Sequence, residues 1–155
     1  MHIEDVANIA KQANELGLAR WVFTGGEPLI SPKLAPFVQA IDPTKWYISC
    51  DSNGWLLNQD RAIMLKMLGI DRIQLSIDSL EARWHDEFRR RIGSHSRCMK
   101  AIDATLQAGL DLFIQTVVTK QRLHSTEFKK FLDYFTNRDI DIFVSFTKPV
   151  GNFEG

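Results

Sequence analysis

The stretch FTGGEPL, residues 23–29, joins an apolar run to two glycines and a carboxylate. The apolar run in which it begins reads as a short strand, because valine and aromatic residues predominate there. Gly25 and Gly26 allow the backbone to approach a ligand closely, and Glu27 offers an acceptor for an ammonium group. Pro28 then fixes the direction in which the chain leaves. The stretch therefore predicts a strand whose carboxyl end opens on a ligand-binding loop.

The same order of apolar run and polar loop repeats along the chain. Strands are expected at residues 20–23, 46–50, 70–77, 112–118 and 140–146. Helices are expected at residues 3–16, 32–41, 59–68, 94–108 and 126–136, with a short charged helix before residue 94. Each of the five strands follows a helix at spacings that fit crossover connections, so the sequence predicts an α/β protein with a parallel sheet. Periodicity alone leaves open whether the strands curl into a barrel or form a doubly wound open sheet.

Composition narrows the class of partner. The 155 residues are 45% hydrophobic and 25% charged, as in an ordinary globular protein, and we expect residues 1–155 to form a single domain. Nineteen basic and nineteen acidic side chains give no net field that would attract nucleic acid or an anionic membrane. No apolar run approaches the ~18 residues that span a bilayer. We therefore expect a cytoplasmic protein with a metabolite-scale partner, and neither nucleic acid nor membrane.

The residues that follow the five predicted strands are nearly all polar. They form five clusters: 24–27, 51–54, 76–79, 119–120 and 147–148. In parallel α/β folds the carboxyl ends of the strands meet at one edge, where ligands bind. A capped helix start or a loop is the plain alternative at any single end, and Gly54 alone would fit a simple turn. Five polar ends on one edge favour a polar ligand, and the short side chains suit hydroxyl groups such as those of ribose: Ser52, Asn53, Ser76 and Asp78.

These motifs, in their order and spacing, resemble the core of the radical S-adenosylmethionine (radical SAM) enzymes. FTGGEPL is followed by DSNG (51–54), IQLSIDS (73–79), HDEFRRRIGSHSRCMKAI (85–102) and VSFTKPVG (144–151). Residues 76–102 look most like the peptide-modifying and sulfatase-maturing branch, which carries extra C-terminal cluster domains (SPASM-like). The resemblance covers essentially the whole chain. It implies a partial (β/α)6 barrel in which S-adenosylmethionine binds across the strand ends.

The resemblance also implies roles for individual residues. Gly25, Gly26 and Glu27, followed by Pro28, match the segment that holds the methionine amino group. Ser52 and Asn53 match a TNG-like motif of the second strand, although Ser52 stands where threonine is usual.

Further roles follow from the later motifs. Ser76 and Asp78 match the motif that contacts the ribose and the methionine end of the ligand. An arginine after this motif often binds the ligand carboxylate, and both Arg89 and Arg97 are candidates. Gln115 and Thr119 are implied to contact the ribose or the substrate. The residues implied to lie beside the adenine are Lys148, Pro149, Val150 and Gly151.

The cysteines depart from the family pattern. Family members bind a [4Fe-4S] cluster through a CxxxCxxC loop after the first strand, because thiolates hold such clusters. These 155 residues contain only Cys50 and Cys98, which we expect to be buried thiols. The sequence therefore predicts a core without its first strand and cluster loop, unable by itself to cleave S-adenosylmethionine to a 5'-deoxyadenosyl radical. The strand at 21–24 would then be an exposed edge, and self-association is expected there.

Two other functions fit the same residues. Lys148 at a strand end could form a Schiff base in a barrel aldolase, with Asp51 or Asp78 moving protons. A non-catalytic descendant that binds a nucleotide or a partner protein is the other alternative. The peptide or small-molecule substrate is not readable in any of these cases.

The arginine run, the histidines and the tryptophans are interpreted as structural residues, not as catalytic or metal-binding ones. The run Arg89-Arg90-Arg91 reads as a solvated helix end, and the four histidines read as surface or capping residues. The tryptophans read as core or rim residues, with Trp55 the best candidate among them to touch a ligand.

Overall fold

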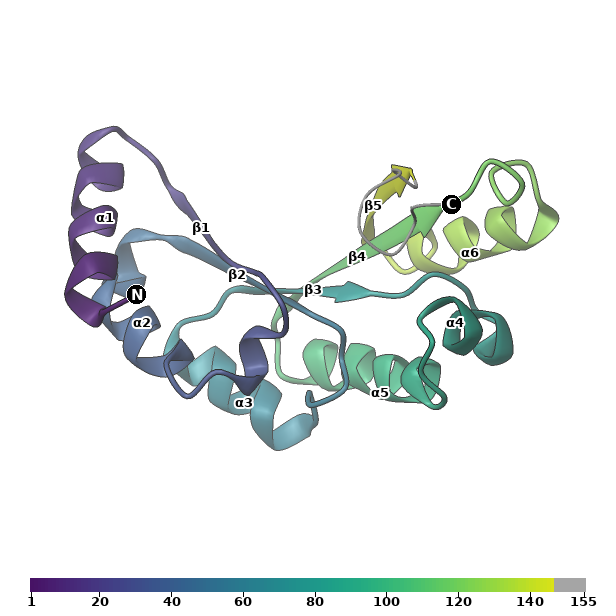
Figure 1. Cartoon of the computed structure of the whole chain (residues 1–155), viewed down its shortest axis with the longest axis horizontal. Coiled ribbons are helices and arrows are strands. Elements are labelled where there is room, and N and C mark those ends of the chain that lie inside the picture. The colour runs from purple at the N-terminus through teal and green to yellow at the C-terminus, as the bar shows by residue number, and fades with distance from the viewer. Residues whose placement is uncertain (147–155) are drawn as a thin grey trace.

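The computed structural model describes residues 1–146, and it confirms the predicted α/β order (Figure 1). The strands are β1 (Arg20–Phe23), β2 (Tyr47–Ser52), β3 (Arg72–Ser76), β4 (Asp111–Val118) and β5 (Asp141–Phe146). The helices are α1 (Ile3–Glu15), α2 (Leu34–Ala40), α3 (Gln59–Leu68), α4 (Ala82–Phe88), α5 (Ser94–Gln107) and α6 (Thr126–Thr136), with short 3-10 turns at Pro28–Ile30 and Pro43–Lys45. No helix in this part of the chain combines the length and apolar character that crossing a bilayer requires.

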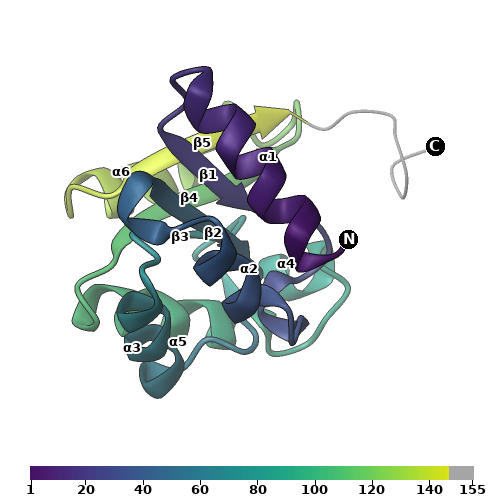
Figure 2. The ribbon, with the colours of Figure 1, turned by 90° about the vertical axis from the view of Figure 1, so that its left-hand side faces the viewer.

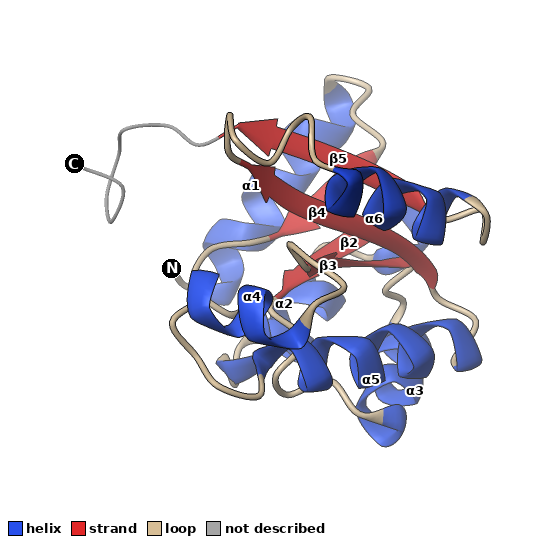
Figure 3. Ribbon diagram, turned by 90° about the vertical axis from the view of Figure 1, so that its right-hand side faces the viewer, coloured by secondary structure: helices blue, strands red, loops and turns tan. Residues whose placement is uncertain are grey.

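The order of the strands decides between a barrel-like and a doubly wound sheet. All five strands are parallel, and they lie side by side in chain order, β1-β2-β3-β4-β5. A doubly wound sheet reverses its order at a switch point, whereas an unreversed order with right-handed crossovers keeps every helix on one face. Figure 3 shows α3 and α5 together on one side of the strands and α6 beside β5. The sheet is therefore part of a singly wound barrel.

The two faces of the sheet differ in character. On the central strands β3 and β4, alternate residues such as Ile73, Leu75 and Ile114 are fully buried under the helices. The intervening side chains lie on the other face and are only partly buried, and they bond to one another across strands. Gln74 donates to Gln115 with an N–O distance of 2.7 Å. These strands thus have an apolar outer face and a polar inner face, with the alternation of inward and outward residues that is typical of barrel strands.

The helices form a continuous outer layer. Helix α1 contacts α2, α2 contacts α3, and α3 contacts α5, which packs on β3 and β4. Figure 2 shows α1 and α2 at the same end of the molecule. Local signals set the limits of α3: the Asn58 side chain accepts a hydrogen bond from Arg61 N at 3.0 Å, and Gly69 ends the helix at a φ of 100°.

One glycine joins this outer layer to the carboxyl edge of the sheet. Gly54 follows β2 with a φ of 77°, and a Cβ at this position would lie 3.0 Å from Cys98 Cα and 3.2 Å from Ala101 Cβ on α5. The glycine is needed because only a residue without Cβ allows this approach in this conformation. Its position fixes the loop after β2 against α5.

Candidate functional site

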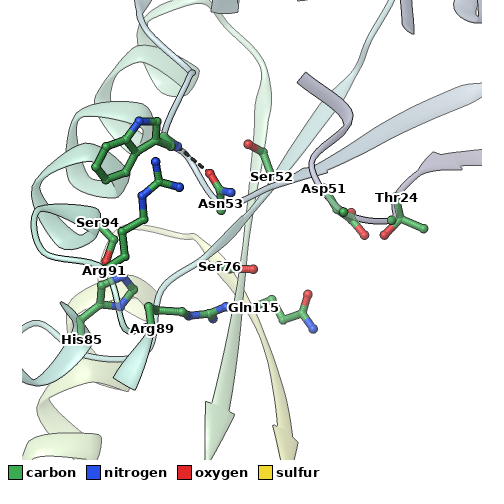
Figure 4. Close-up of a pocket in the computed structure, with 13 residues that line it drawn as sticks. Thr24, Asp51, Ser52, Asn53, Ser76, His85, Arg89, Arg91, Ser94 and Gln115 are labelled. Carbon is green, nitrogen blue, oxygen red and sulfur yellow. Dashed lines mark hydrogen bonds between the residues drawn. The ribbon is translucent and has the colours of Figure 1, made fainter. Parts of the chain in front are cut away.

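A cavity of about 420 Å³ opens at the carboxyl edge of the sheet (Figure 4). Its walls come from the carboxyl halves of β2 to β4 with the loops after β1 and β2, and from α4, the start of α5 and the segment between these helices. The lining residues are Thr24, Gly25, Gly26, Asp51, Ser52, Asn53, Trp55, Ser76, His85, Arg89, Arg91, Ser94 and Gln115. A volume of this size suits a small-molecule ligand, and the walls are predominantly polar. The cavity lies at the carboxyl ends of the strands, where the sequence predicts a site for a polar ligand.

Glu27 ties the loop after β1 to the loop after β2. Its Oε1 accepts from Ser52 Oγ at 2.9 Å and from Leu29 N at 3.2 Å, and its Oε2 accepts from Asn53 N at 2.8 Å. The carboxylate is thus oriented by three donors, and Glu27, although it follows Gly26 in the chain, is not among the residues that line the cavity. Pro28 begins the 3-10 turn after it and does not line the cavity.

The glycine pair presents backbone to the cavity. Gly25 has a φ of 127°, a conformation that a residue with Cβ rarely adopts, and nothing lies within 4 Å of a Cβ placed on Gly25 or Gly26. The space in front of both residues is therefore open. A ligand can reach the backbone groups of this loop without meeting a side chain.

The loop after β2 is held by its own short polar side chains. Ser52 Oγ accepts from Gly54 N at 3.1 Å, and Asn53 Oδ1 accepts from Trp55 N at 2.9 Å. Strand β2 extends to Ser52, so Asp51 and Ser52 belong to the strand and only Asn53 follows it. Asn53 remains exposed at the cavity.

Asp78 supports the site from behind its wall. Its side chain is fully buried, accepts from Val117 N at 2.9 Å through Oδ1, and pairs through Oδ2 with Arg89 Nε at 2.5 Å. Asp78 does not line the cavity, whereas Ser76 and Arg89 do. The structure therefore makes Asp78 a partner of Arg89, with no open path to a substrate for the proton transfer that an aldolase would need.

The two candidate arginines are in different places. Arg89 lines the cavity, its side chain is 31% exposed, and it extends from the α4 side toward Ser76 in Figure 4. Arg97 is exposed on α5, outside the cavity lining, with its guanidinium carbon 5.4 Å from the centre of the Trp55 ring. The geometry thus selects Arg89 over Arg97 as a ligand contact.

The reading of the histidines as surface or capping residues is wrong for His85. This side chain is buried in the cavity wall, and its Nδ1 accepts from Asp78 N at 3.1 Å. Burial lowers the pKa of His85 to about 4, and the Arg89 charge adds to the effect while Asp78 opposes it. His85 is therefore neutral at pH 7, with its proton on Nε2.

The reading of the arginine run as a solvated helix end is also wrong in part. Arg89 is ion-paired, and Arg91 lies with its guanidinium carbon 3.5 Å from the centre of the Trp55 ring. Trp55 itself lines the cavity, as expected for the tryptophan after the Asn-Gly pair. Ser94 completes this wall from the start of α5, and no sequence signal pointed to it or to Arg91.

The remaining predicted contacts divide into three groups. Gln115 lines the cavity from β4, opposite Ser76 in the strand register. Thr119 lies outside the cavity in the loop after β4, where its Oγ1 accepts from Arg122 N at 3.3 Å. The four residues predicted to contact the adenine lie outside the described residues: Lys148, Pro149, Val150 and Gly151.

The cysteines are buried thiols, as predicted. Desolvation by burial raises the pKa of Cys50 and of Cys98 to about 12 in each case, so neither is a thiolate at neutral pH. Among residues 1–146, no three His, Cys, Asp or Glu side chains gather as metal ligands. The described residues therefore do not fit an iron–sulfur cluster, which needs thiolate ligands.

Curated relatives share the sequence of this core. The GTP 3',8-cyclase of Hydrogenovibrio crunogenus is 29% identical over 150 residues, which cover 96% of this chain and 45% of the relative. The AdoMet-dependent heme synthase of Oleidesulfovibrio alaskensis is 31% identical over 109 residues, covering 70% of this chain and 28% of the relative. The chain thus spans less than half the length of these relatives, and such relatives do not single out the peptide-modifying branch.

Solved structures share the fold. SuiB of Streptococcus suis bound to S-adenosylmethionine superposes with a TM-score of 0.78 at 20% identity, over 99% of this chain and 35% of SuiB. A sequence model described as the Radical SAM superfamily matches residues 1–132. Together with the parallel half-barrel and the motif-lined cavity at its carboxyl edge, this match shows that the chain belongs to the radical SAM superfamily.

Proposed function

We propose that this chain forms the S-adenosylmethionine-binding part of a radical SAM iron–sulfur oxidoreductase or maturase. The observation that carries the proposal is the polar cavity of about 420 Å³, with a guanidinium fixed at one wall and a carboxylate-backed glycine loop at another. S-Adenosylmethionine is a zwitterionic amino acid joined to a nucleoside. These walls offer complementary groups for both of its parts.

Arg89 is the proposed partner of the ligand carboxylate. Its Nε is bound to Asp78, which orients the guanidinium and leaves its terminal nitrogens as donors toward the cavity. The neutral His85 lines the same wall and adds its Nε2–H as a donor that suits an oxyanion, whereas the Ser94 hydroxyl already donates to Asp86 at 2.9 Å.

Glu27 and Asp51 are the proposed partners of the ligand's positive charges. Glu27 is held in place by Ser52 and Asn53, so its negative charge is fixed beside Gly26. Asp51 lies on the inner face of β2 and lines the cavity. An ammonium group at Gly25 and Gly26 would meet backbone carbonyls and the Asp51 carboxylate, and the negative charge of Glu27, the next residue in the chain, would add to the attraction.

Ser76, Gln115 and Asn53 are the proposed contacts of the ribose hydroxyls. Ser76 and Gln115 face each other across β3 and β4, and the Gln115 amide oxygen is oriented by its hydrogen bond from Gln74. These side chains supply both donors and acceptors, which a diol requires.

The iron–sulfur cluster of the family supplies the electron for reductive cleavage of S-adenosylmethionine. We propose that its cysteine ligands are not among these 155 residues, since Cys50 and Cys98 are buried and protonated. On this proposal the chain alone binds the cofactor and does not cleave it. Near-stoichiometric iron and sulfide in the purified chain would contradict this part.

Substitution of Glu27 tests the binding role. Glu27→Gln removes the charge beside the glycine loop, and a charge-assisted hydrogen bond is worth about 1.5–3 kcal/mol, so we expect S-adenosylmethionine to bind about ten to a hundred times more weakly. Isothermal titration calorimetry measures the affinity. Glu15→Gln, an exposed position at the end of α1, is the matched control and should leave the affinity unchanged. Equal affinities for wild type and Glu27→Gln would refute the role.

A further inference from the structure

Two arginines line the cavity, and only one of them is neutralised by the protein. Arg89 pairs with the buried Asp78, whereas none of the ion pairs among the described residues includes Arg91. In Figure 4 the two side chains extend in different directions from neighbouring positions. Arg91 is therefore a separate cationic group at the cavity, not a second partner of the same site as Arg89.

The segment that carries Arg91 is held in place by Asp86. The Asp86 carboxylate accepts from Gly93 N at 2.6 Å, from His95 N at 2.8 Å and from Ser94 Oγ at 2.9 Å. Its backbone carbonyl accepts from Arg91 N at 2.9 Å. The backbone hydrogen bond from His95, the largest cause, holds the pKa of Asp86 below its usual value, so this anchor stays charged at neutral pH. Arg91 thus projects from an ordered turn.

Trp55 fixes the side chain of Arg91 in turn. The guanidinium carbon lies 3.5 Å from the centre of the indole ring, which is a close cation–π contact. Trp55 is anchored by the bond from its backbone nitrogen to Asn53 Oδ1 at 2.9 Å. Stacking occupies the face of a guanidinium and leaves the N–H groups at its edge free, and this fork matches the two oxygens of a carboxylate or phosphate.

In the proposed binding mode, no charged group of S-adenosylmethionine pairs with the Arg91 guanidinium. The ligand brings one carboxylate, for which Arg89 is the proposed partner, and two positive groups, for which Glu27 and Asp51 are the proposed partners. Arg91 is exposed to solvent, and it then remains as an oriented cation at the cavity for which neither S-adenosylmethionine nor an ion pair among the described residues supplies a counter-charge.

We propose that Arg91, stacked on Trp55, binds an oxyanion of a second ligand, the substrate, which shares the cavity with S-adenosylmethionine. The substrate is accordingly a carboxylate or a phosphate compound. This inference rests on the proposed function, because it assigns Arg89 to the cofactor.

The test is a two-step calorimetric titration of the whole chain. S-Adenosylmethionine is titrated first, and the saturated chain is then titrated in separate arms with glutarate and with inorganic pyrophosphate, which distinguish a carboxylate from a phosphate site. Arg91→Gln should weaken binding of the better anion about tenfold or more and change the affinity for S-adenosylmethionine by less than about twofold. Arg90→Gln, which removes the same charge from the adjacent exposed position, should change neither.

The outcomes separate the two proposals. Failure of the wild-type chain to bind S-adenosylmethionine would overturn the proposed function and this inference with it. Cofactor binding without any anion binding in either arm would overturn the inference alone. The inference alone would also be overturned if Arg90→Gln lowered the anion affinity as much as Arg91→Gln does. A loss of affinity for S-adenosylmethionine in Arg91→Gln would overturn it as well.

Discussion

Individual residues at the cavity divide into those that contact a ligand and those that hold others in place. Asp78 shows the second kind: it is fully buried, and it fixes Arg89 through an ion pair and the backbone of β4 through a bond from Val117 N. Glu27 similarly joins two loops. The site therefore depends on charges that are already oriented before a ligand arrives, which lowers the cost of binding.

His85 makes the stability of the wall depend on pH. Its pKa is lowered from 6.5 to about 4 in the folded chain, so the stabilisation is complete above pH 6.5 and is lost as the pH falls toward 4. Between pH 7 and pH 5 the unfolding free energy of wild type should fall by about 2 kcal/mol more than that of His85→Gln. Urea unfolding at several pH values measures the difference. Parallel pH profiles would show that the folded imidazole titrates normally.

Sequence reasoning at this scale found residues at strand ends and residues on the inner face of the sheet. Gly25 and Gly26 follow β1, whereas Ser76 ends β3 and Gln115 lies within β4, and all four line the cavity. It named Arg89 and Arg97 as candidates through the family resemblance and did not find Arg91, because three identical letters in a row carry no information about which side chains face the cavity. That choice depends on the turn that Asp86 organises, which is a tertiary feature.

Elements position the site through one close contact between α5 and the loop after β2. A Cβ on Gly54 would meet the backbone of Cys98 at 3.0 Å, whereas one on Gly17, which has almost the same φ, would meet nothing within 4 Å. Gly17→Ala should therefore cost about 1 kcal/mol for the backbone conformation alone. Gly54→Ala should cost about 1–3 kcal/mol more, since α5 must shift.

Denaturant unfolding of both alanine variants checks this comparison. The Gly54 variant should also lose affinity for S-adenosylmethionine, because Ser52 and Asn53 move with the loop, while the Gly17 variant should keep it. Equal losses of stability in the two variants would mean that α5 yields to the added methyl group without strain.

The elements themselves were largely predictable. Gln59–Leu68 and Thr126–Thr136 have the expected limits because Asn58, Gly69 and Ser125 are strong local cap signals. Strand β2 is longer than expected and β3 is shorter, since polar Asp51 and Ser52 continue the pairing while Ile70 and Ile77 do not. Strand ends depend on the neighbouring strand, which a single sequence segment does not reveal.

In the part of the chain that the structure describes, the whole molecule is a curved parallel sheet covered by helices, and β1 and β5 are the two edge strands. The unreversed strand order was not readable from periodicity, because strand order is a property of long-range contacts. The resemblance of the ordered motifs to radical SAM enzymes supplied it instead. The family match and the sheet confirm that expectation.

We propose that the chain self-associates through the free edge of β1, an edge that has no neighbouring strand among the described residues. Val22 on this strand is 44% exposed, and an unpaired strand edge is a template for pairing with a second chain. We expect dimers or larger species whose fraction rises with concentration, and Val22→Lys should shift them toward monomer because an edge charge opposes pairing. Light scattering across a wide concentration range measures this. A wild-type chain that is monomeric throughout would disprove the proposal.

The central claim is that the cavity at the carboxyl edge binds S-adenosylmethionine with Arg89 at its carboxylate. Calorimetry of wild type, Arg89→Gln and Arg97→Gln tests it most directly, because the two arginines carry the same charge and only Arg89 lines the cavity. We predict one site per chain, an affinity about ten to a hundred times lower for Arg89→Gln, and no change for Arg97→Gln. Absence of binding by the wild-type chain, or equal losses in the two variants, would contradict the account.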